Sequence, residues 1–172
     1  MRISTSGRYA LRAILDLALY NDKGPVLRSD IAARQEITAD YIAQLFRRLT
    51  QKGLVRSVMG PGGGYVLGRA PAQITLGDIV RASEGPIGLV ACVLPGGEVV
   101  CKRYETCVTR RVWARLSRSM EQFLDSITLQ DLVDEALQQG PEWTGACSPV
   151  VEAFTDSLEN PPCEGPQEYV VG

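Results

Sequence analysis

Three cysteines lie near the middle of the chain, in a segment rich in glycine and charge. Cys92, Cys101 and Cys107 follow the spacing C-x8-C-x5-C. Because glycine lets a backbone turn freely, thiolates that are distant in such a loop can converge on an iron–sulfur centre or a zinc ion. The 172 residues include no histidine, so imidazole cannot complete the site, even from a second copy of the chain. The pattern predicts a thiolate site with an open fourth position.

The cysteine count and the hydropathy pattern indicate where such a site would work. The chain has five cysteines, an odd number that favours metal binding or redox sensing over a disulfide scaffold. No apolar run approaches the roughly 20 residues that span a bilayer. Arg12 and Asp16 interrupt the apolar stretch 10–19, which is typical of an amphipathic helix and not of a signal peptide. We therefore expect a cytoplasmic protein with no membrane contact.

Charge is divided unevenly along the chain, although the net charge is only −2. Residues 1–70 carry 11 Lys or Arg and 5 Asp or Glu, a balance of +6. Residues 71–172 carry 7 and 15, a balance of −8. A basic half beside an acidic half is typical of a nucleic-acid binding module with a non-binding appendage. The alternative is a chance distribution over a solvated surface.

Apolar spacing predicts three helices in the basic half. The first covers residues 3–20, and a short helix follows over residues 29–34, which either Ser29 or Asp30 can cap. A third, longer helix begins after Thr38, which can cap it, and ends before a glycine. A short helix, a turn and a longer helix with a polar, basic outer face is typical of a helix-turn-helix. The residues of the third helix expected to face inward are Ile42, Leu45, Phe46 and Leu49.

A glycine-rich hairpin is predicted directly after the third helix. Residues 54–58 and 65–67 favour strands, and the segment 59–64 between them is Met-Gly-Pro-Gly-Gly-Gly. In this position a hairpin is a wing, and its glycines permit positive φ and close approach of backbone N–H groups to a phosphate. The alternative, a nucleotide-binding phosphate loop, requires a Lys and a following helix, and neither is present.

The acidic half predicts three further helices. Thr75 and Asp78 resemble a capping box that opens a helix to about residue 83, and a second such pair at Thr128 and Asp131 opens the last helix, to about residue 139. Between them a long helix is expected over residues 107–126. Its apolar stripe consists of Val112, Leu116, Met120, Phe123 and Leu124, with Trp113 beside them. We expect this stripe to pair with its twin in a homodimer; the alternative is packing on its own chain alone.

The predicted fold is mainly α, a winged helix-turn-helix plus a long dimerisation helix with one small β-hairpin. Four parts are expected: a DNA-binding domain over residues 1–84, a cysteine-bearing loop over 85–107, the long and last helices over 108–139, and an acidic, flexible tail rich in Pro and Gly over 140–172.

Several segments resemble one family of regulators. They are Met1–Ala10, Leu15–Ala18, Tyr41–Phe46, Ile127–Leu129 and above all the wing sequence Gly60–Tyr65. Through about residue 139 the chain resembles the IscR-type (Rrf-type) winged-helix transcriptional regulators. The resemblance implies a homodimeric bacterial transcription factor, a repressor or an activator, in which a long helix crosses to the partner.

The resemblance also implies a use for the cysteines. In cluster-binding members three cysteines hold an iron–sulfur cluster near the dimer interface, and Cys92, Cys101 and Cys107 occupy those positions. The expected cluster is 2Fe–2S, with 4Fe–4S as the alternative. The family's histidine ligand falls on Arg110, and the carboxylate ligand of another branch falls on Arg8; a protonated guanidinium does not bind iron. The candidates for the fourth ligand are Glu98, Glu105, Cys147, Cys163, a small thiol or water.

The DNA contacts follow from the helix-turn-helix. Gln44 is the expected base reader, because its amide can pair bidentately with adenine. The other candidates are Thr38, Asp40 and Tyr41 at the start of the recognition helix; Arg2, Ser4, Tyr9, Arg47 and Arg56 as phosphate contacts; and Gly62 and Gly63 in the wing. Tyr9 has an alternative role as a core residue of the first helix. The expected partner is double-stranded DNA with a partly palindromic operator.

Two other classes of function compete with a cluster-dependent regulator. One is a cluster-free regulator that uses the same cysteines as a thiol or zinc switch. The other is a small redox protein, which the winged-helix pattern disfavours. Catalysis is not expected, because no Ser–His or Cys–His pair and no Walker sequence is present.

Overall fold

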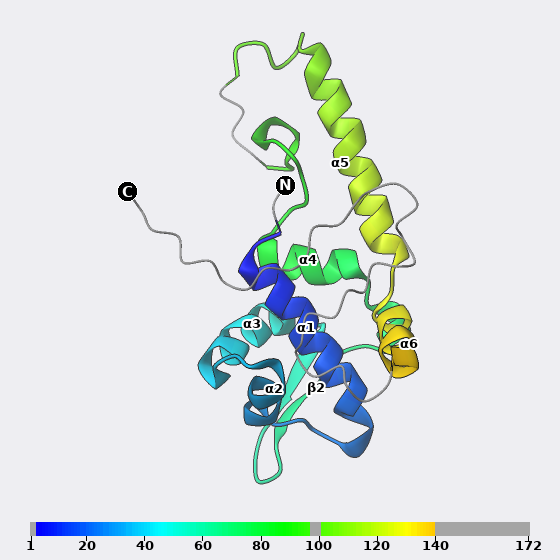
Figure 1. The fold of residues 1–172 in the computed structure, drawn as a ribbon. Helices are drawn as coiled ribbons and strands as arrows, with labels where there is room; N and C mark the ends of the chain where they lie inside the picture. Colours follow the sequence, from blue (N-terminus) through cyan, green and yellow to red (C-terminus); the bar gives the residue numbers. More distant parts are fainter. Residues whose placement is uncertain (1–2, 97–100, 140–172) are drawn as a thin grey trace, which may run out of the picture.

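The computed structural model describes residues 3–96 and 101–139. Eight regular elements are joined by three short 3-10 turns (Figure 1). The elements are α1 (Thr5–Tyr20), α2 (Arg28–Gln35), α3 (Ala39–Gln51), β1 (Val55–Val58), β2 (Gly64–Leu67), α4 (Leu76–Glu84), α5 (Val108–Ser126) and α6 (Leu129–Gln139), and the turns are η1 (Asn21–Lys23), η2 (Pro71–Gln73) and η3 (Ala91–Val93). The prediction of a mainly helical chain with one antiparallel hairpin is confirmed.

The helix-turn-helix is formed by α2 and α3. Glu36 ends α2 in the left-handed region, at φ 55°, and redirects the chain. Thr38 then caps α3, accepting a hydrogen bond from the Tyr41 amide at 3.3 Å, as predicted. The predicted cap of α2 is wrong: the N-cap residue is Leu27, which offers no side-chain acceptor. Ser29 is already inside the helix, and its hydroxyl bonds to Asp30 instead.

The main core joins α1, α2, α3 and the hairpin. The four residues predicted to face inward from α3 are buried, and Phe46 packs edge-on against Tyr65 of β2 with ring centroids 4.7 Å apart. Leu129 and Val133 of α6 belong to the same cluster, so the last helix returns to the first domain. Burying this shared apolar surface is what stabilises the module.

The hairpin projects from the body as a wing (Figure 1). Val55 pairs with Leu67 and Val58 with Gly64. Its base is tied to the segment before α2, because Val26 and Tyr65 exchange two backbone hydrogen bonds of 2.8 and 2.9 Å. This bridge fixes the wing next to the helix-turn-helix.

Caps define the two helices on either side of α5. Thr128 and Asp131 form the predicted capping box: each backbone N–H donates to the other side chain, at 2.8 and 3.2 Å. At α4 the box is half formed. Thr75 accepts from the Asp78 amide at 3.0 Å, but the Asp78 carboxylate bonds to Arg81 instead of returning to the cap.

The long helix α5 extends away from the body (Figure 1). Its buried residues are Ser117 and Leu124, the latter packed with Val80 and Ile87 in a small second cluster. Met120 is half-buried, and the other large apolar side chains of α5 are exposed, namely Val108, Val112, Trp113, Leu116 and Phe123. No helix in the described residues is long and apolar enough to cross a membrane. The expected tail, with Cys147 and Cys163, lies outside the described residues, as do Arg2 and Glu98.

Candidate nucleic-acid interface and cysteine loop

One face of α3 carries the predicted DNA readers. Asp40, Gln44 and Arg47 are exposed and spaced by four and three residues, so they share one face of the helix. Thr38 lies exposed at the start of the same helix. The opposite face is buried in the core. The helix therefore presents an amide, a carboxylate and a guanidinium together to solvent.

The two predicted tyrosines are partly structural. Tyr9 and Tyr41 are half-buried against the main core, and their rings meet edge to face with centroids 5.9 Å apart. The Arg12 guanidinium lies 5.5 Å from the centre of the Tyr9 ring. The contact between the Tyr9 and Tyr41 rings joins α1 to the first turn of the recognition helix. Tyr9 therefore has the packing role that was considered for it as the alternative.

A hollow of about 330 Å³ separates α3 from the wing. Its lining includes Arg47 from the helix and Ser57 and Tyr65 from the strands. Arg56 is exposed on β1. Arg47 is the charged residue of this lining, and Arg56, next to Ser57 on β1, points to the opposite face of the strand.

The wing tip is shaped by its glycines. Gly62 is exposed and adopts φ 73°, which favours glycine. The Gly63 amide donates to the Gly60 carbonyl at 2.9 Å, and a Cβ at position 63 would overlap the Val58 carbonyl oxygen. The turn thus requires glycine at 63, and its N–H is already used inside the turn. Met59 beside it is 92% exposed.

The N-terminal turn of α1 is held by a residue that the sequence did not single out. Ser4 caps the helix, and its amide and hydroxyl both donate to Glu84 Oε1, at 3.1 and 2.5 Å. Arg48 of α3 is exposed, and it also donates to the Ser83 carbonyl at 2.9 Å. No sequence pattern marks such long-range contacts between helix ends.

A buried carboxylate fastens α1 to α2. Asp16 accepts two hydrogen bonds from Arg34 at 2.7 and 2.9 Å and one from the Gln35 amide at 2.9 Å. The hydrogen bond to Asp16 raises the pKa of Arg34 above its usual value. Arg12 completes the set by donating to the Gln35 side chain at 3.0 Å. Sequence alone identified Asp16 only as a break in an apolar run.

The three candidate ligands lie on two structured segments. Cys92 is half-buried on η3, Cys107 is the N-cap residue of α5, and Cys101 is exposed in the turn that precedes it. Among the residues that the structure describes, no three Cys, Asp or Glu side chains come together as a metal site. The donor types suit a thiolate-bound metal or cluster, whereas the arrangement of the single chain leaves the three sulfurs apart.

Arg110 ties the two ends of the loop together. Its Nε donates to the Cys92 carbonyl at 3.3 Å, and an Nη bonds to the Tyr104 hydroxyl. The guanidinium also lies 3.7 Å from the centre of the Tyr104 ring. Arg110 therefore acts as a brace that keeps η3 beside the first turn of α5.

Cys107 is the activated thiol of the set. Its Sγ lies 3.1 Å from the Thr109 hydroxyl. Hydrogen bonds from that hydroxyl and from the Arg110 backbone lower the pKa of Cys107 below its usual value. A lowered pKa raises the thiolate fraction, which is the form that binds metals and reacts with oxidants. Glu105 is exposed in the same turn.

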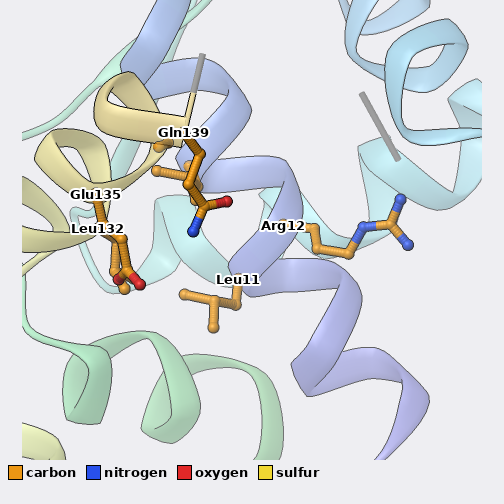
Figure 2. A pocket seen from close by; sticks show the side chains of 7 residues that line it. Leu11, Arg12, Leu132, Glu135 and Gln139 are labelled. Atoms are coloured by element: carbon orange, nitrogen blue, oxygen red, sulfur yellow. The ribbon is translucent and has the colours of Figure 1, made fainter. Parts of the chain in front are cut away.

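A second hollow, of about 190 Å³, lies between α1 and α6 (Figure 2). Its lining is mainly apolar and consists of Leu11, Arg12, Leu15, Leu132, Glu135, Ala136 and Gln139. The Arg12 side chain points away from the other labelled residues (Figure 2), and its Nε donates to Gln35 at 3.0 Å. The hollow is therefore a packing surface without a set of converging polar groups.

The fold and the exposed α3 face define a winged-helix transcriptional regulator. The profile of one family, described as "Rrf2: Iron-dependent Transcriptional regulator", matches residues 3–135, and the chain belongs to this family. The HTH-type transcriptional regulator IscR of Cronobacter sakazakii is 43% identical over 134 residues, which cover 78% of this chain and 81% of that relative. The predicted family resemblance is confirmed.

Solved structures agree with this assignment. The IscR structure from T. potens is 37% identical, with a TM-score of 0.65, and the match covers 82% of this chain and 92% of that one. CymR, described as the global cysteine regulator of B. subtilis, is 39% identical with the same TM-score of 0.65, over 78% and 98% of the two chains. The chain is thus a transcriptional regulator of the IscR/Rrf2 type.

Proposed function

We propose that the chain forms a homodimer that binds a partly palindromic DNA operator and that an iron–sulfur cluster on Cys92, Cys101 and Cys107 tunes this binding. The observation that carries the proposal is the pairing, in one chain, of an exposed polar face on α3 with a thiol-bearing loop at the start of an apolar helix. The family description as iron-dependent regulators supports it.

Residue types and exposure support the DNA contacts. Gln44 is exposed in the middle of α3 and can pair with a base edge in the major groove. Arg47, which lines the hollow between helix and wing, and Arg56, which is exposed on β1, suit phosphate contacts that position the protein without specifying sequence. The flanking candidates are Arg2, Ser4, Tyr9, Thr38, Asp40, Tyr41, Gly62 and Gly63.

The exposure of α5 supports the homodimer. Val112 is 56% exposed, Leu116 is 45% and Phe123 is 51%. Monomeric proteins rarely leave large apolar side chains together along one helix, because burying them in a partner is favourable. A second copy would cover this stripe and bring two recognition helices onto half-sites about 34 Å apart, or a multiple of that.

The thiols support a cluster by their chemistry. Cys107 is biased toward the thiolate by its own hydrogen bonds, and Arg110 holds Cys92 at the same end of α5. A bound iron–sulfur cluster supplies a centre whose charge changes with redox state. In this proposal the loop closes when all three sulfurs bind, and the fourth ligand comes from another side chain, a small thiol or water.

A cluster-free thiol switch is the second candidate, and two observations favour it. The three sulfurs are not gathered within the described residues, and Arg110, in the position of the family's histidine ligand, donates hydrogen bonds and cannot bind a metal. A similar protein, CymR, is described as the global cysteine regulator of B. subtilis.

Anaerobic native mass spectrometry of the full chain separates the two candidates. A dimer carrying the mass of two 2Fe–2S or 4Fe–4S clusters, lost when the three cysteines are changed to serine, is the expected result. A dimer that carries zinc or no added mass favours the thiol switch. Variants Cys147→Ser and Cys163→Ser, measured alongside, show whether either residue supplies the fourth ligand.

Gln44→Ala tests the DNA assignment. The loss of one bidentate base contact should cost about 1–3 kcal/mol of operator binding and relax the preference at one base position. Binding is measured by fluorescence anisotropy on an operator selected from random duplexes and on a scrambled duplex. Gln138→Ala, an exposed glutamine on α6, is the matched control. Equal weakening on both duplexes in the Gln44 variant would contradict the role of base reader.

A further inference from the structure

One carboxylate oxygen of Glu84 accepts three hydrogen bonds from the N-terminal turn of α1. Its Oε1 accepts hydrogen bonds from the Ser4 amide at 3.1 Å, the Ser4 hydroxyl at 2.5 Å and the Gly7 amide at 2.9 Å. The first amides of a helix lack partners within the helix, so a carboxylate there satisfies them and also complements the helix dipole. The cap comes from the last residue of α4, 77 positions away from Gly7.

The Glu84 carboxylate lies so close to Gly7 that no side chain fits at this position. A Cβ on Gly7 would overlap Glu84 Oε1. Gly7 is buried within α1, where glycine is otherwise unfavourable compared with alanine. Because its backbone φ is not in the positive region, no turn requires glycine here. The absence of a side chain at position 7 is what lets the carboxylate seat against the helix.

The neighbouring residue of α4 is connected to the recognition helix. Arg48 of α3 donates from one nitrogen, Nη1, to the Ser83 carbonyl at 2.9 Å and to the Ser6 hydroxyl at 3.2 Å. The end of α4 thus holds both α1 and α3. Ser83 itself is buried, and its hydroxyl bonds back to the carbonyls of its own helix.

The position of this junction links it to the thiols. Gly85, at φ 89°, ends α4 immediately after Glu84, and the chain then enters the cysteine-bearing segment 85–107. Ser83 and Glu84 are thus the last two residues of α4 before that segment begins. These two residues hold the N-terminal turn of α1, where Ser4 lies, and Arg48, which lies next to Arg47 on α3.

We infer that Glu84 is a positioning residue that, together with Arg48, couples the cysteine loop to the DNA-facing turn of α1 and to the recognition helix. The inference rests on the proposed function, because it needs the loop to change state and α3 to bind DNA. Coupling of this kind requires an element with contacts to both sites, and α4 has them.

The experiment compares operator affinity with and without the sulfur trio in two backgrounds. Full-length protein and its Cys92, Cys101, Cys107→Ser form are titrated against the selected operator, each with Glu84 intact and as Glu84→Ala. Coupled sites typically differ by about 5–150-fold in affinity. With Glu84 intact, we expect the operator affinities of the cysteine form and the serine form to differ by a factor in this range. In the Glu84→Ala background we expect the ratio of the two affinities to approach one.

Three further variants make the test specific. Gly7→Ala displaces the carboxylate while favouring the helix, so it should also lower the ratio without loss of folding. Glu84→Gln keeps an acceptor oxygen and should restore part of the ratio. Glu135→Ala, an exposed glutamate of α6 outside the junction, should leave the ratio unchanged.

Hydrogen exchange of the N-terminal peptide provides a readout that does not depend on DNA. With Glu84 intact, changing the trio to serine should alter exchange in the first turn of α1; in Glu84→Ala it should not. If both backgrounds keep the same affinity ratio and the same exchange response, the inference is overturned and the proposed function stands. If the intact protein shows no affinity ratio, the proposed function fails, and the exchange response alone then decides the inference.

Discussion

The recognition helix α3 and the long helix α5 differ in how much of their apolar side-chain surface is buried. In α3 the four inward side chains are all between 0 and 2% exposed. Across the 19 residues of α5, the buried residues are Ser117 and Leu124, whereas Val108 reaches 75% exposure. The winged helix thus buries its apolar face within the single chain, with help from α6, whereas α5 leaves an apolar stripe exposed. In the proposed function, a second copy of the chain covers that stripe.

The helix starts show the same contrast. Ser4, Thr38 and Thr75 cap α1, α3 and α4 with side-chain hydrogen bonds. The N-cap residue of α5 is Cys107, which has no hydroxyl or carboxylate to act as a cap. A thiol is a weak hydrogen-bond acceptor, so it holds the first amides of a helix less firmly than a serine or threonine hydroxyl does. The Arg110 guanidinium adds a contact at this end of α5 by donating to the Cys92 carbonyl.

The largest expected difference is in folding stability, when a leucine is changed to alanine in each of the two helices. Leu49→Ala in α3 removes a fully buried side chain and should lower the free energy of unfolding by about 3–5 kcal/mol. Leu116→Ala in α5 should lower it by less than about 1 kcal/mol at the level of the single chain. It should instead weaken the dimer about tenfold. Urea unfolding and sedimentation equilibrium measure the two effects, and a similar loss of folding stability in both variants would contradict the comparison.

The next effect concerns two ion pairs. Asp16 is 2% exposed and bonds to Arg34 at 2.7 Å, whereas Asp125 of α5 is 43% exposed and bonds to Arg81 at 2.6 Å. Asp16→Asn leaves Arg34 without its anion inside the module and should cost about 3 kcal/mol. Asp125→Asn should cost less than about 1 kcal/mol, because water and salt screen the exposed pair. Unfolding at low and at high salt checks both values, with salt sensitivity expected at Asp125 alone.

The smallest effect is a pH dependence at the start of α6. Hydrogen bonds from the Thr128 backbone and hydroxyl lower the pKa of Asp131 below its ordinary value of 3.8. A carboxylate with a lowered pKa in the folded state stabilises the fold above its ordinary pKa, and this stabilisation is lost as pH falls through the lower value. Asp131→Asn should therefore flatten the acid limb of a thermal melting series below about pH 4. An unchanged acid limb would show that the capping box adds no stability.

The sequence predicted the elements of the fold well because their signals are local. Apolar spacing in α3, the glycine tip of the wing and the Thr128–Asp131 pair each fix structure within a few residues. The predicted cap of α2 was wrong because the helix starts at Arg28, which places Ser29 and Asp30 within its first turn, two residues after Val26 enters its bridge with Tyr65. Local patterns do not report such tertiary contacts.

The candidate sites could be predicted only in part. Helical spacing was enough to place Asp40, Gln44 and Arg47 on one exposed face. It could not show that Glu84 binds the first turn of α1 or that Arg48 reaches α4, because the partners lie 35 to 80 residues apart in the chain. The arrangement of the three cysteines likewise depends on loop closure, which spacing does not determine.

In the proposed function, the thiol-bearing half of the chain controls how the winged-helix half binds DNA. The most direct measurement is an anaerobic anisotropy titration of the selected operator, at one fixed salt concentration, with the natural chain and with its Cys92, Cys101, Cys107→Ser form. We expect operator affinities that differ severalfold between the two forms, and equal affinities of the two forms for a scrambled duplex. Identical operator affinities for the two forms would contradict it.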